Sequence, residues 1–234
     1  MKARLIDESP KEKKGIHIMA AQKKATYQLS FWEGKFGDEY IGRNAFEKWK
    51  VQLGKKAFGR MLKNITVDSI LEVGSNIGLN LVYLNAFYNG RVDLFAVEPN
   101  KKAFTILSSE KNRNTKNAWN CSAFKMPLED SSIDLVFTSG VLIHIAPHDL
   151  GRATDEICRI SKEYILCMEY FSHKPVEETY RGGKGLLFKR DFGSFYLERY
   201  PGIKCVNYGF LWKQEFKIFD DLNWWLFKKK NSSK

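Results

Sequence analysis

The sequence predicts an α/β protein with a doubly wound, mostly parallel sheet. Apolar runs suited to buried strands alternate with helical patterns between residues 69 and 169, and short connections join them. Such alternation is typical of strand–helix–strand units with right-handed crossovers. A glycine turn after the first run and a carboxylate after the second indicate a ligand site at the carboxyl edge of the sheet.

The elements of this core follow from their hydrophobic periods and their flanking turn residues. Strands are expected at Ser69–Val73, Val92–Val97, Ala118–Ser122, Ile133–Thr138 and Tyr164–Glu169, and helices near Gly78–Tyr88, Lys101–Asn114 and Asp149–Ser161. Two aromatic runs, 204–212 and 222–227, are expected to pair as an antiparallel C-terminal edge, which completes a Rossmann-like, seven-stranded sheet.

The chain outside the core divides by composition. We expect a flexible basic arm at 1–21, an N-terminal helical lid at 22–63 that is interrupted at 31–42, a ligand-binding domain at 64–228 with an insertion at about 170–200, and a basic tail at 229–234. A length of 234 residues is enough for one full core with a small extension.

Composition restricts the classes of protein that remain. Hydrophobic residues make up 44% of the chain, so it is not disordered, and no apolar run has membrane-spanning length. The four cysteines stand singly, which predicts reduced thiols in a cytoplasmic protein and no metal site. Much of the net charge of +11 lies near the termini without a nucleic-acid-recognition motif. The charge therefore favours anionic partners in general, and no nucleic acid partner is expected.

The run S-I-L-E-V-G-S-N-I-G-L-N at 69–80 is the most informative motif. It breaks from strand to helix through Gly74 and Gly78, where backbone can approach a ligand that a Cβ would exclude. Asn76 replaces the middle glycine of the dinucleotide fingerprint, and Glu98 follows at the tip of the next strand. A carboxylate at that tip accepts ribose hydroxyls in nucleotide-binding sheets. Together they predict a site for an adenosyl ligand.

The carboxyl ends of parallel strands meet in one crevice, which unites motifs that are scattered along the chain. A lid segment of aromatic and polar residues near the N-terminus is expected to fold over the ligand, the alternative being plain packing of its aromatic residues on the core. The predicted ligand-binding residues are Tyr40, Arg43, Asn44, Gly74, Ser75, Asn76, Gly78, Glu98, Ser122, Ala123, Ser139 and Gly140.

Two residues could act on a second substrate. His144 follows the fourth strand and would face the crevice as a base or hydrogen-bond partner. The alternative is a structural histidine in the core. Glu169, at the tip of the fifth strand, is the reserve candidate for the base.

The motifs resemble those of class I S-adenosylmethionine (SAM) methyltransferases, whose E/D-x-G-x-x-x-G variant cradles a methionine moiety. The succession F-W-E-G-K-F-G-D-E-Y-I-G-R-N, L-I-H-I-A-P, E-Y-F-S, Y-R-G-G-K-G-L-L-F-K-R-D-F-G, V-N-Y-G-F-L-W-K and D-D-L-N-W-W-L-F resembles the pseudaminic-acid-biosynthesis-associated methylases over about residues 30–227. Ser122 departs from the pattern, because many of these enzymes place an adenine-contacting Asp there.

The resemblance implies SAM as cofactor, S-adenosylhomocysteine (SAH) as product, and a small, anionic acceptor related to nonulosonic acids or surface glycans. Tyr170, Tyr180, Arg181, Lys189 and Arg190 would form an aromatic, basic acceptor wall. An ordinary salt-bridged helix start at 189–191 is the alternative for the last two. Methylation of RNA or protein and a SAM-binding scaffold without catalysis are the alternative functions, and the oligomeric state is left open.

Overall fold

The computed structural model describes residues 25–109 and 115–230. Its main sheet has seven strands in the order β3-β2-β1-β4-β5-β9-β8. The strands are β1 (Ser69–Val73), β2 (Asp93–Val97), β3 (Thr115–Trp119), β4 (Ile133–Ser139), β5 (Ser161–Glu169), β8 (Ile203–Leu211) and β9 (Leu222–Lys229). β1 to β5 are parallel, and β9 is antiparallel to both β5 and β8. The predicted fold, including the antiparallel edge, is confirmed.

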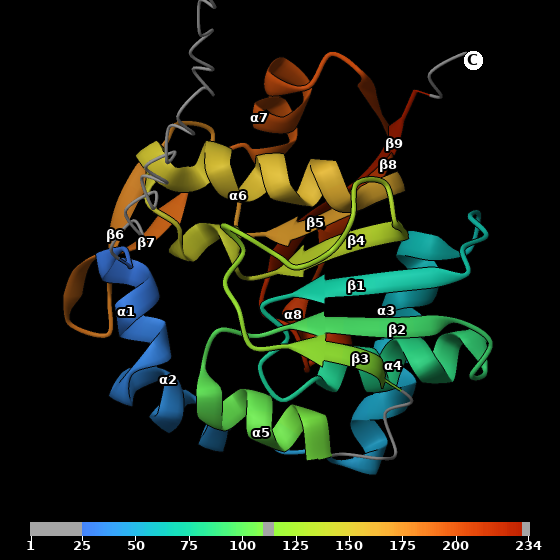
Figure 1. Ribbon diagram of the computed structural model, residues 1–234, viewed down its shortest axis with the longest axis horizontal. Helices are drawn as coiled ribbons and strands as arrows, with labels where there is room; N and C mark the ends of the chain where they lie inside the picture. The colour runs from blue at the N-terminus through green and yellow to red at the C-terminus, as the bar shows by residue number, and fades with distance from the viewer. Residues whose placement is uncertain (1–24, 110–114, 231–234) are drawn as a thin grey trace, which may run out of the picture.

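Helices cover both faces of the sheet (Figure 1). α3 (Lys48–Leu62) and α4 (Leu79–Tyr88) share one apolar core with the strands, and α6 (Pro147–Ile160) and α7 (Phe192–Arg199) share the other. α5 (Lys101–Ser109) joins β2 to β3, and α8 (Lys213–Phe216) lies between β8 and β9. Since the central strands are buried on both faces, their sequences read as continuous apolar runs.

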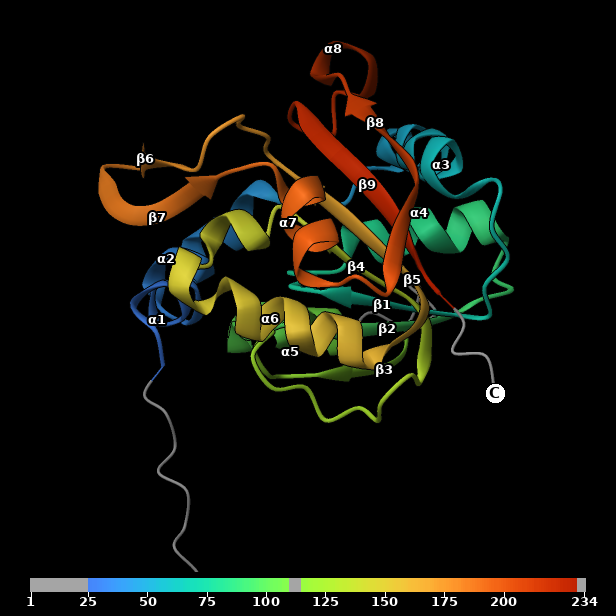
Figure 2. The same cartoon turned by 90° about the horizontal axis from the view of Figure 1, so that it is seen from above.

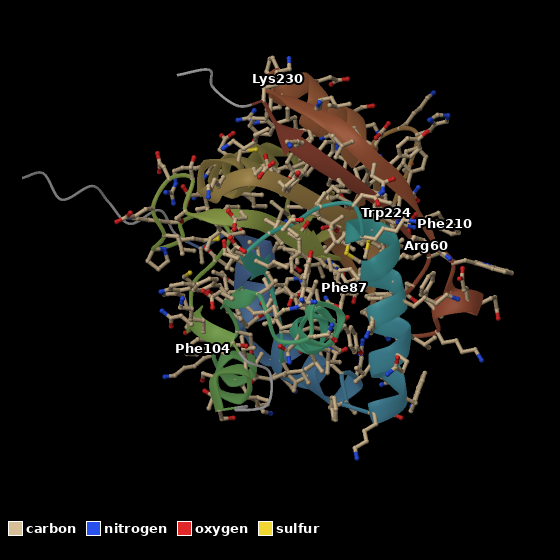
Figure 3. All side chains as sticks on the ribbon, turned by 90° about the vertical axis from the view of Figure 1, so that its right-hand side faces the viewer. Arg60, Phe87, Phe104, Phe210, Trp224 and Lys230 are labelled. Carbon is tan, nitrogen blue, oxygen red and sulfur yellow. The ribbon has the colours of Figure 1, made fainter. Side chains whose placement is uncertain are left out.

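Glycines on α3 allow it to approach α4 closely. A Cβ on Gly54 would lie 2.1 Å from the Tyr83 ring, and one on Gly59 would lie 3.3 Å from the Phe87 ring. Figure 3 shows α3 along the side of the molecule with Phe87 nearby. This helix is part of the core. Residues 48–62, which the predicted lid at 22–63 includes, bury Phe58 in the core that α3 shares with the sheet.

Two smaller structures stand at the carboxyl edge of the sheet, toward which β1, β2 and β3 point (Figure 1). The first contains α1 (Tyr27–Glu33), α2 (Lys35–Tyr40) and η1 (Ile41–Arg43), and we call residues 27–43 the lid. The second is a hairpin of β6 (Val176–Tyr180) and β7 (Gly183–Lys189), which extends from the body of the molecule beside the lid (Figure 2). Gln28 Nε2 donates to the Gly185 carbonyl at 2.8 Å and so joins the two.

One predicted strand is misplaced. The expected strand at Ala118–Ser122 begins three residues earlier, at Thr115, and ends at Trp119. Its first residues are polar because β3 is an edge strand, and the apolar pattern therefore marks only its second half. As a result Ser122 and Ala123 lie in the loop beyond the sheet.

Several expectations concern the ends of the chain or the whole molecule. The predicted arm at 1–21 and the tail beyond Lys230 lie outside the described residues, as does the end of the predicted helix at 110–114. All four cysteines are described, and each is a free thiol. None of the described helices is long and apolar enough to cross a membrane.

Candidate functional site

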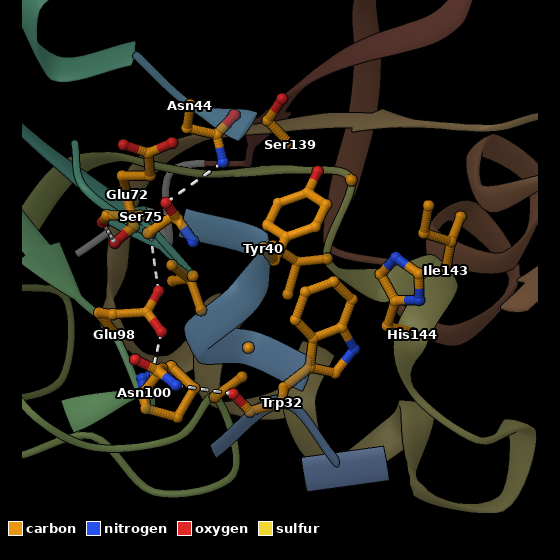
Figure 4. A pocket seen from close by; sticks show the side chains of 18 of the residues that line it. Trp32, Tyr40, Asn44, Glu72, Ser75, Glu98, Asn100, Ser139, Ile143 and His144 are labelled. Carbon is orange, nitrogen blue, oxygen red and sulfur yellow. Dashed lines mark hydrogen bonds between the residues drawn. The ribbon is translucent and has the colours of Figure 1, made fainter. Parts of the chain in front are cut away.

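A cavity of ≈ 560 Å³ opens at the carboxyl ends of β1, β2 and β4, under the lid and beside the hairpin. Figure 4 shows side chains from the sheet, the lid and the loop after β4 converging on it. Ligands of open α/β sheets bind at this position, where the strand order reverses beside β1.

The turn after β1 is held in a left-handed conformation. Gly74 (φ +77°) and Gly78 (φ +80°) adopt it without strain, and Asn76 (φ +49°) occupies it as one of the few other residues that tolerate it. The Gly74 and Ser75 N–H groups donate to the Val97 carbonyl at 2.7 and 3.0 Å. This turn is thereby fastened to the end of β2.

Glu98 follows β2 and is only 6% exposed. Its two carboxylate oxygens accept the N–H groups of Asn76 and Asn100, each at 2.7 Å. Burial raises its pKa to about 7, while these two hydrogen bonds oppose the shift. A carboxylate has about four acceptor positions, so capacity remains for two hydroxyl donors.

Glu72, near the end of β1, is a second buried acid at the cavity. One of its oxygens accepts Asn80 Nδ2 at 2.7 Å, and the other, Oε2, is buried without a partner among the described residues. Burial raises its pKa to about 8, and the nearby Glu98 adds to the shift. An orphaned carboxylate oxygen at a cavity is a natural partner for a cationic group of a ligand.

Lid residues line the opposite side of the cavity. Asn44 Nδ2 donates to Asn76 Oδ1 at 3.3 Å and so joins the chain after η1 to the glycine turn. The Arg43 guanidinium lies 5.4 Å from the Tyr40 ring centre and 5.9 Å from that of Phe36. The structure thus places the predicted lid residues beside the predicted ligand-binding turn.

His144 lies in η3 (Leu142–His144), directly after β4. Its Nδ1 atom is 2.6 Å from the Leu186 carbonyl oxygen on β7. Its ring packs between two aromatic rings, and the ring centres of Trp32 and Tyr180 lie 4.6 and 5.0 Å from that of His144. Burial lowers its pKa from the ordinary value of 6.5 to about 4. The imidazole is therefore neutral at physiological pH.

Further aromatic and charged groups surround the acceptor side of the cavity. The Arg181 guanidinium lies 5.9 Å from the Tyr180 ring centre, and Arg181 has φ +52°, an uncommon conformation for this residue type. Tyr170 donates to Asp220 at 2.8 Å. Among the described residues neither Arg43 nor Arg181 pairs with a carboxylate, which leaves two cationic groups at the cavity.

The structure brings most predicted site residues to this one cavity. The predicted residues that line it are Tyr40, Arg43, Asn44, Gly74, Ser75, Asn76, Glu98, Ser122, Ala123, Ser139, Gly140, His144, Tyr170, Tyr180 and Arg181. Gly78 does not line it, because its role is to turn the chain into α4 as the N-cap.

Three residues predicted for the acceptor side do not line this cavity. Glu169 is fully buried, and its carboxylate accepts the N–H groups of residues 141–143 at 3.0 to 3.3 Å, which makes it a support for the loop before His144. Lys189 pairs with Glu178 at 2.7 Å, and Arg190 stacks 4.3 Å over Phe195. Both face a separate, smaller cavity. The alternative of a helix start holds for Asp191, which caps α7, whereas Lys189 ends β7 and pairs across the hairpin.

Sequence reasoning missed several residues that line the cavity, and four of them carry polar or aromatic groups of interest. Glu72 is the acidic residue of the glycine motif itself and could have been found there. Asn100 stands at a helix start after Glu98-Pro99, where asparagine is a common cap. Trp32 and Asp220 reach the cavity only through tertiary packing, which no local pattern indicates.

The sheet order, the antiparallel edge and the cavity at the switch point together define the fold as that of the class I SAM-dependent methyltransferases. Residues 71–164 match the family model described as a methyltransferase domain. Among curated proteins, none matches the sequence significantly.

Solved structures with this fold are similar in shape but distant in sequence. Magnesium protoporphyrin IX methyltransferase from Synechocystis PCC 6803, crystallised with SAM, has a TM-score of 0.62 at 9% identity, covering 89% of this chain and 100% of its own. The 1,6-didemethyltoxoflavin-N1-methyltransferase of Burkholderia thailandensis, crystallised with SAH, has a TM-score of 0.60 at 12% identity. The match covers 83% of this chain and 85% of that one. The [4+2]-cyclase SpnF has a TM-score of 0.57 at 13% identity, and the match covers 81% of this chain and 84% of that one. At these identities the likeness establishes the fold alone.

Proposed function

We propose that the chain is a SAM-dependent methyltransferase acting on a small, anionic sugar or nucleotide-sugar acceptor of nonulosonic-acid or surface-glycan biosynthesis. The observation that carries the proposal is Glu98, a buried carboxylate with spare acceptor capacity at the tip of β2, beside the glycine turn and inside the cavity. The acceptor class comes from the motif resemblance and from the two arginines.

The residues at the cavity fit the cofactor. Glu98 would accept the ribose hydroxyls, the loop at Ser122 and Ala123 would border the adenine, and the orphaned Glu72 oxygen would receive the amino group of the methionine moiety. Arg43 would pair with the methionine carboxylate. Bound SAM supplies a methyl group on a sulfonium, which is open to in-line attack by an acceptor nucleophile.

The protein's own contribution would be alignment and proton removal. Alignment can supply about 7–11 kcal/mol of the barrier. The Leu186 carbonyl can only accept a hydrogen bond, so His144 Nδ1 carries the proton and Nε2 keeps its lone pair. His144 Nε2 would receive the proton of an acceptor hydroxyl, while Arg181 would hold the acceptor's carboxylate or phosphate.

Turnover tests this function directly. Purified full-length protein is incubated with SAM and a panel of carboxylated sugars, nucleotide sugars and their neutral analogues, and SAH formation is measured. We expect SAH with anionic members and not with neutral ones. SAM binding without turnover on any acceptor would favour a scaffold, and turnover on RNA or protein alone would contradict the acceptor class.

A further inference from the structure

Asn100 connects the cofactor side of the cavity to the lid. It is 2% exposed and follows Glu98 by two residues, and its backbone N–H donates to Glu98 Oε1 at 2.7 Å. Its side chain lies between Glu98 and Trp32 (Figure 4). A buried amide in this place needs an explanation beyond the turn itself.

The side-chain oxygen of Asn100 caps α5. Oδ1 accepts the Ala103 N–H at 2.8 Å, three residues on, in the usual N-cap arrangement. Serine and aspartate would serve that purpose equally well. The cap therefore does not account for an asparagine.

The side-chain nitrogen of Asn100 donates its hydrogen bonds to the lid. Nδ2 donates to the Asp38 carboxylate at 2.9 Å and to the carbonyls of Trp32 and Glu33 at 3.1 and 3.3 Å. These two carbonyls belong to the last turn of α1, where a helix leaves its acceptors unpaired. Nδ2 thus joins the end of α1 to the first turn of α2.

Gly37 permits this contact. A Cβ there would lie 1.8 Å from the Trp32 carbonyl oxygen and 2.8 Å from Asn100 Nδ2. The lid is built to receive this amide at the point from which the Trp32 ring reaches His144.

We propose that Asn100 is a positioning residue that couples occupation of the ribose carboxylate Glu98 to the seating of the lid, and so to the packing of Trp32 on His144. Asn100 is assigned no direct contact with the cofactor or with the acceptor. Its backbone binds the carboxylate that faces the cofactor, and its side chain binds the lid that covers the acceptor. This inference rests on the cofactor site proposed above.

Asn100→Ser separates the two functions of the side chain, because a serine hydroxyl keeps the cap on α5 but cannot reach the lid acceptors. Asn120→Ser is the matched control. Asn120 Nδ2 donates to the carbonyls of Glu98 and Pro99 at 2.8 and 2.9 Å, so it supports the same loop without touching the lid.

Amide hydrogen exchange of the full chain, measured by mass spectrometry with and without SAH, tests the coupling. In the wild type and in Asn120→Ser we expect SAH to slow exchange across residues 27–43. In Asn100→Ser the lid should exchange about tenfold or more faster without ligand, because the hydrogen bonds from Nδ2 to the lid are lost, and SAH should no longer slow it. Exchange in α5 should be unchanged.

Three results would overturn the proposal. They are SAH-dependent protection of the lid that persists in Asn100→Ser, an equal loss in Asn120→Ser, and faster exchange in α5 as large as that in the lid. Failure of the wild type to bind SAH would instead count against the proposed function, while the ligand-free comparison of lid exchange would still decide for or against the Asn100 contact. A double variant with Asp38→Ala should exchange no faster than Asn100→Ser alone, because both changes cut the same contact.

Discussion

His144 Nδ1 lies 2.6 Å from the Leu186 carbonyl oxygen, so β7 of the hairpin sets the tautomer of this histidine at the cavity. A neutral ring that donates through Nδ1 presents an unprotonated Nε2. This is the form that a base requires, and it is held by a backbone group that does not titrate.

His144→Asn tests the role of Nε2. The asparagine amide can still donate to the Leu186 carbonyl, but it carries no basic nitrogen. For a hydroxyl acceptor we expect turnover to fall about a hundredfold or more, with SAM affinity within a factor of a few. Steady-state rates and calorimetric titration check the two quantities. Wild-type turnover in His144→Asn, together with a loss in His144→Ala, would return His144 to a structural role.

The lowered pKa of His144 also predicts how stability depends on pH. Between its ordinary value of 6.5 and about 4, the unfolded chain binds a proton there that the folded chain does not. The free energy of unfolding should therefore fall as the pH falls through this window, by up to roughly 3 kcal/mol. Urea titrations at pH 7 and pH 4.5 should show a larger fall for the wild type than for His144→Asn. Equal falls in both would contradict the assignment.

Substitutions at Gly74 and Gly140 test protein packing and ligand contact separately. A Cβ on Gly74 would lie 2.6 Å from the Val141 side chain, whereas one on Gly140 would have no protein atom within 4 Å. Both have positive φ, so alanine costs some backbone strain at each site. We expect Gly74→Ala to lower the melting temperature more, and Gly140→Ala to lower SAM affinity with the smaller thermal loss. Thermal scans and titrations with SAM check this pair, and the reverse ranking would contradict it. Substitution of Gly74 is therefore not a clean probe of the cofactor.

The raised pKa of Glu72 leads us to expect that cofactor binding releases a proton. With a pKa of about 8 it is largely protonated at pH 7 in the free protein. A cationic amino group placed beside its orphaned oxygen would favour the carboxylate form and displace the proton. Calorimetric titration with SAM in buffers of different ionisation enthalpy should show this release in the wild type and less of it in Glu72→Gln. Buffer-independent heats in the wild type would contradict the placement.

The sheet could be predicted from the sequence because β1, β2, β4 and β5 are buried on both faces and read as apolar runs. β3 begins three residues before its predicted position, because an edge strand tolerates polar residues such as Asn117 that the apolar pattern does not mark. The end of the lid was also missed, since α3 follows it as a further helical pattern although it packs in the core.

The cofactor side of the site could be predicted because Gly74 and Glu98 stand at strand ends, where topology decides their positions. The acceptor side could not be predicted as well. Whether Glu169 faces the cavity or the loop of residues 141–143 depends on how that loop folds back over β5, and the choice of Arg181 over Arg190 depends on the hairpin. Neither has a local sequence signal.

In the proposed site Glu98 holds the ribose of SAM, and the SAM affinity of a Glu98→Ala variant is the decisive measurement. Glu163→Ala is the control, because Glu163 pairs with Lys228 at 2.8 Å and does not line the cavity. We expect Glu98→Ala to lose about 1.5–3 kcal/mol of binding free energy, roughly 10- to 150-fold in Kd, and the control to match the wild type. Unchanged SAM affinity in a folded Glu98→Ala variant would contradict the site.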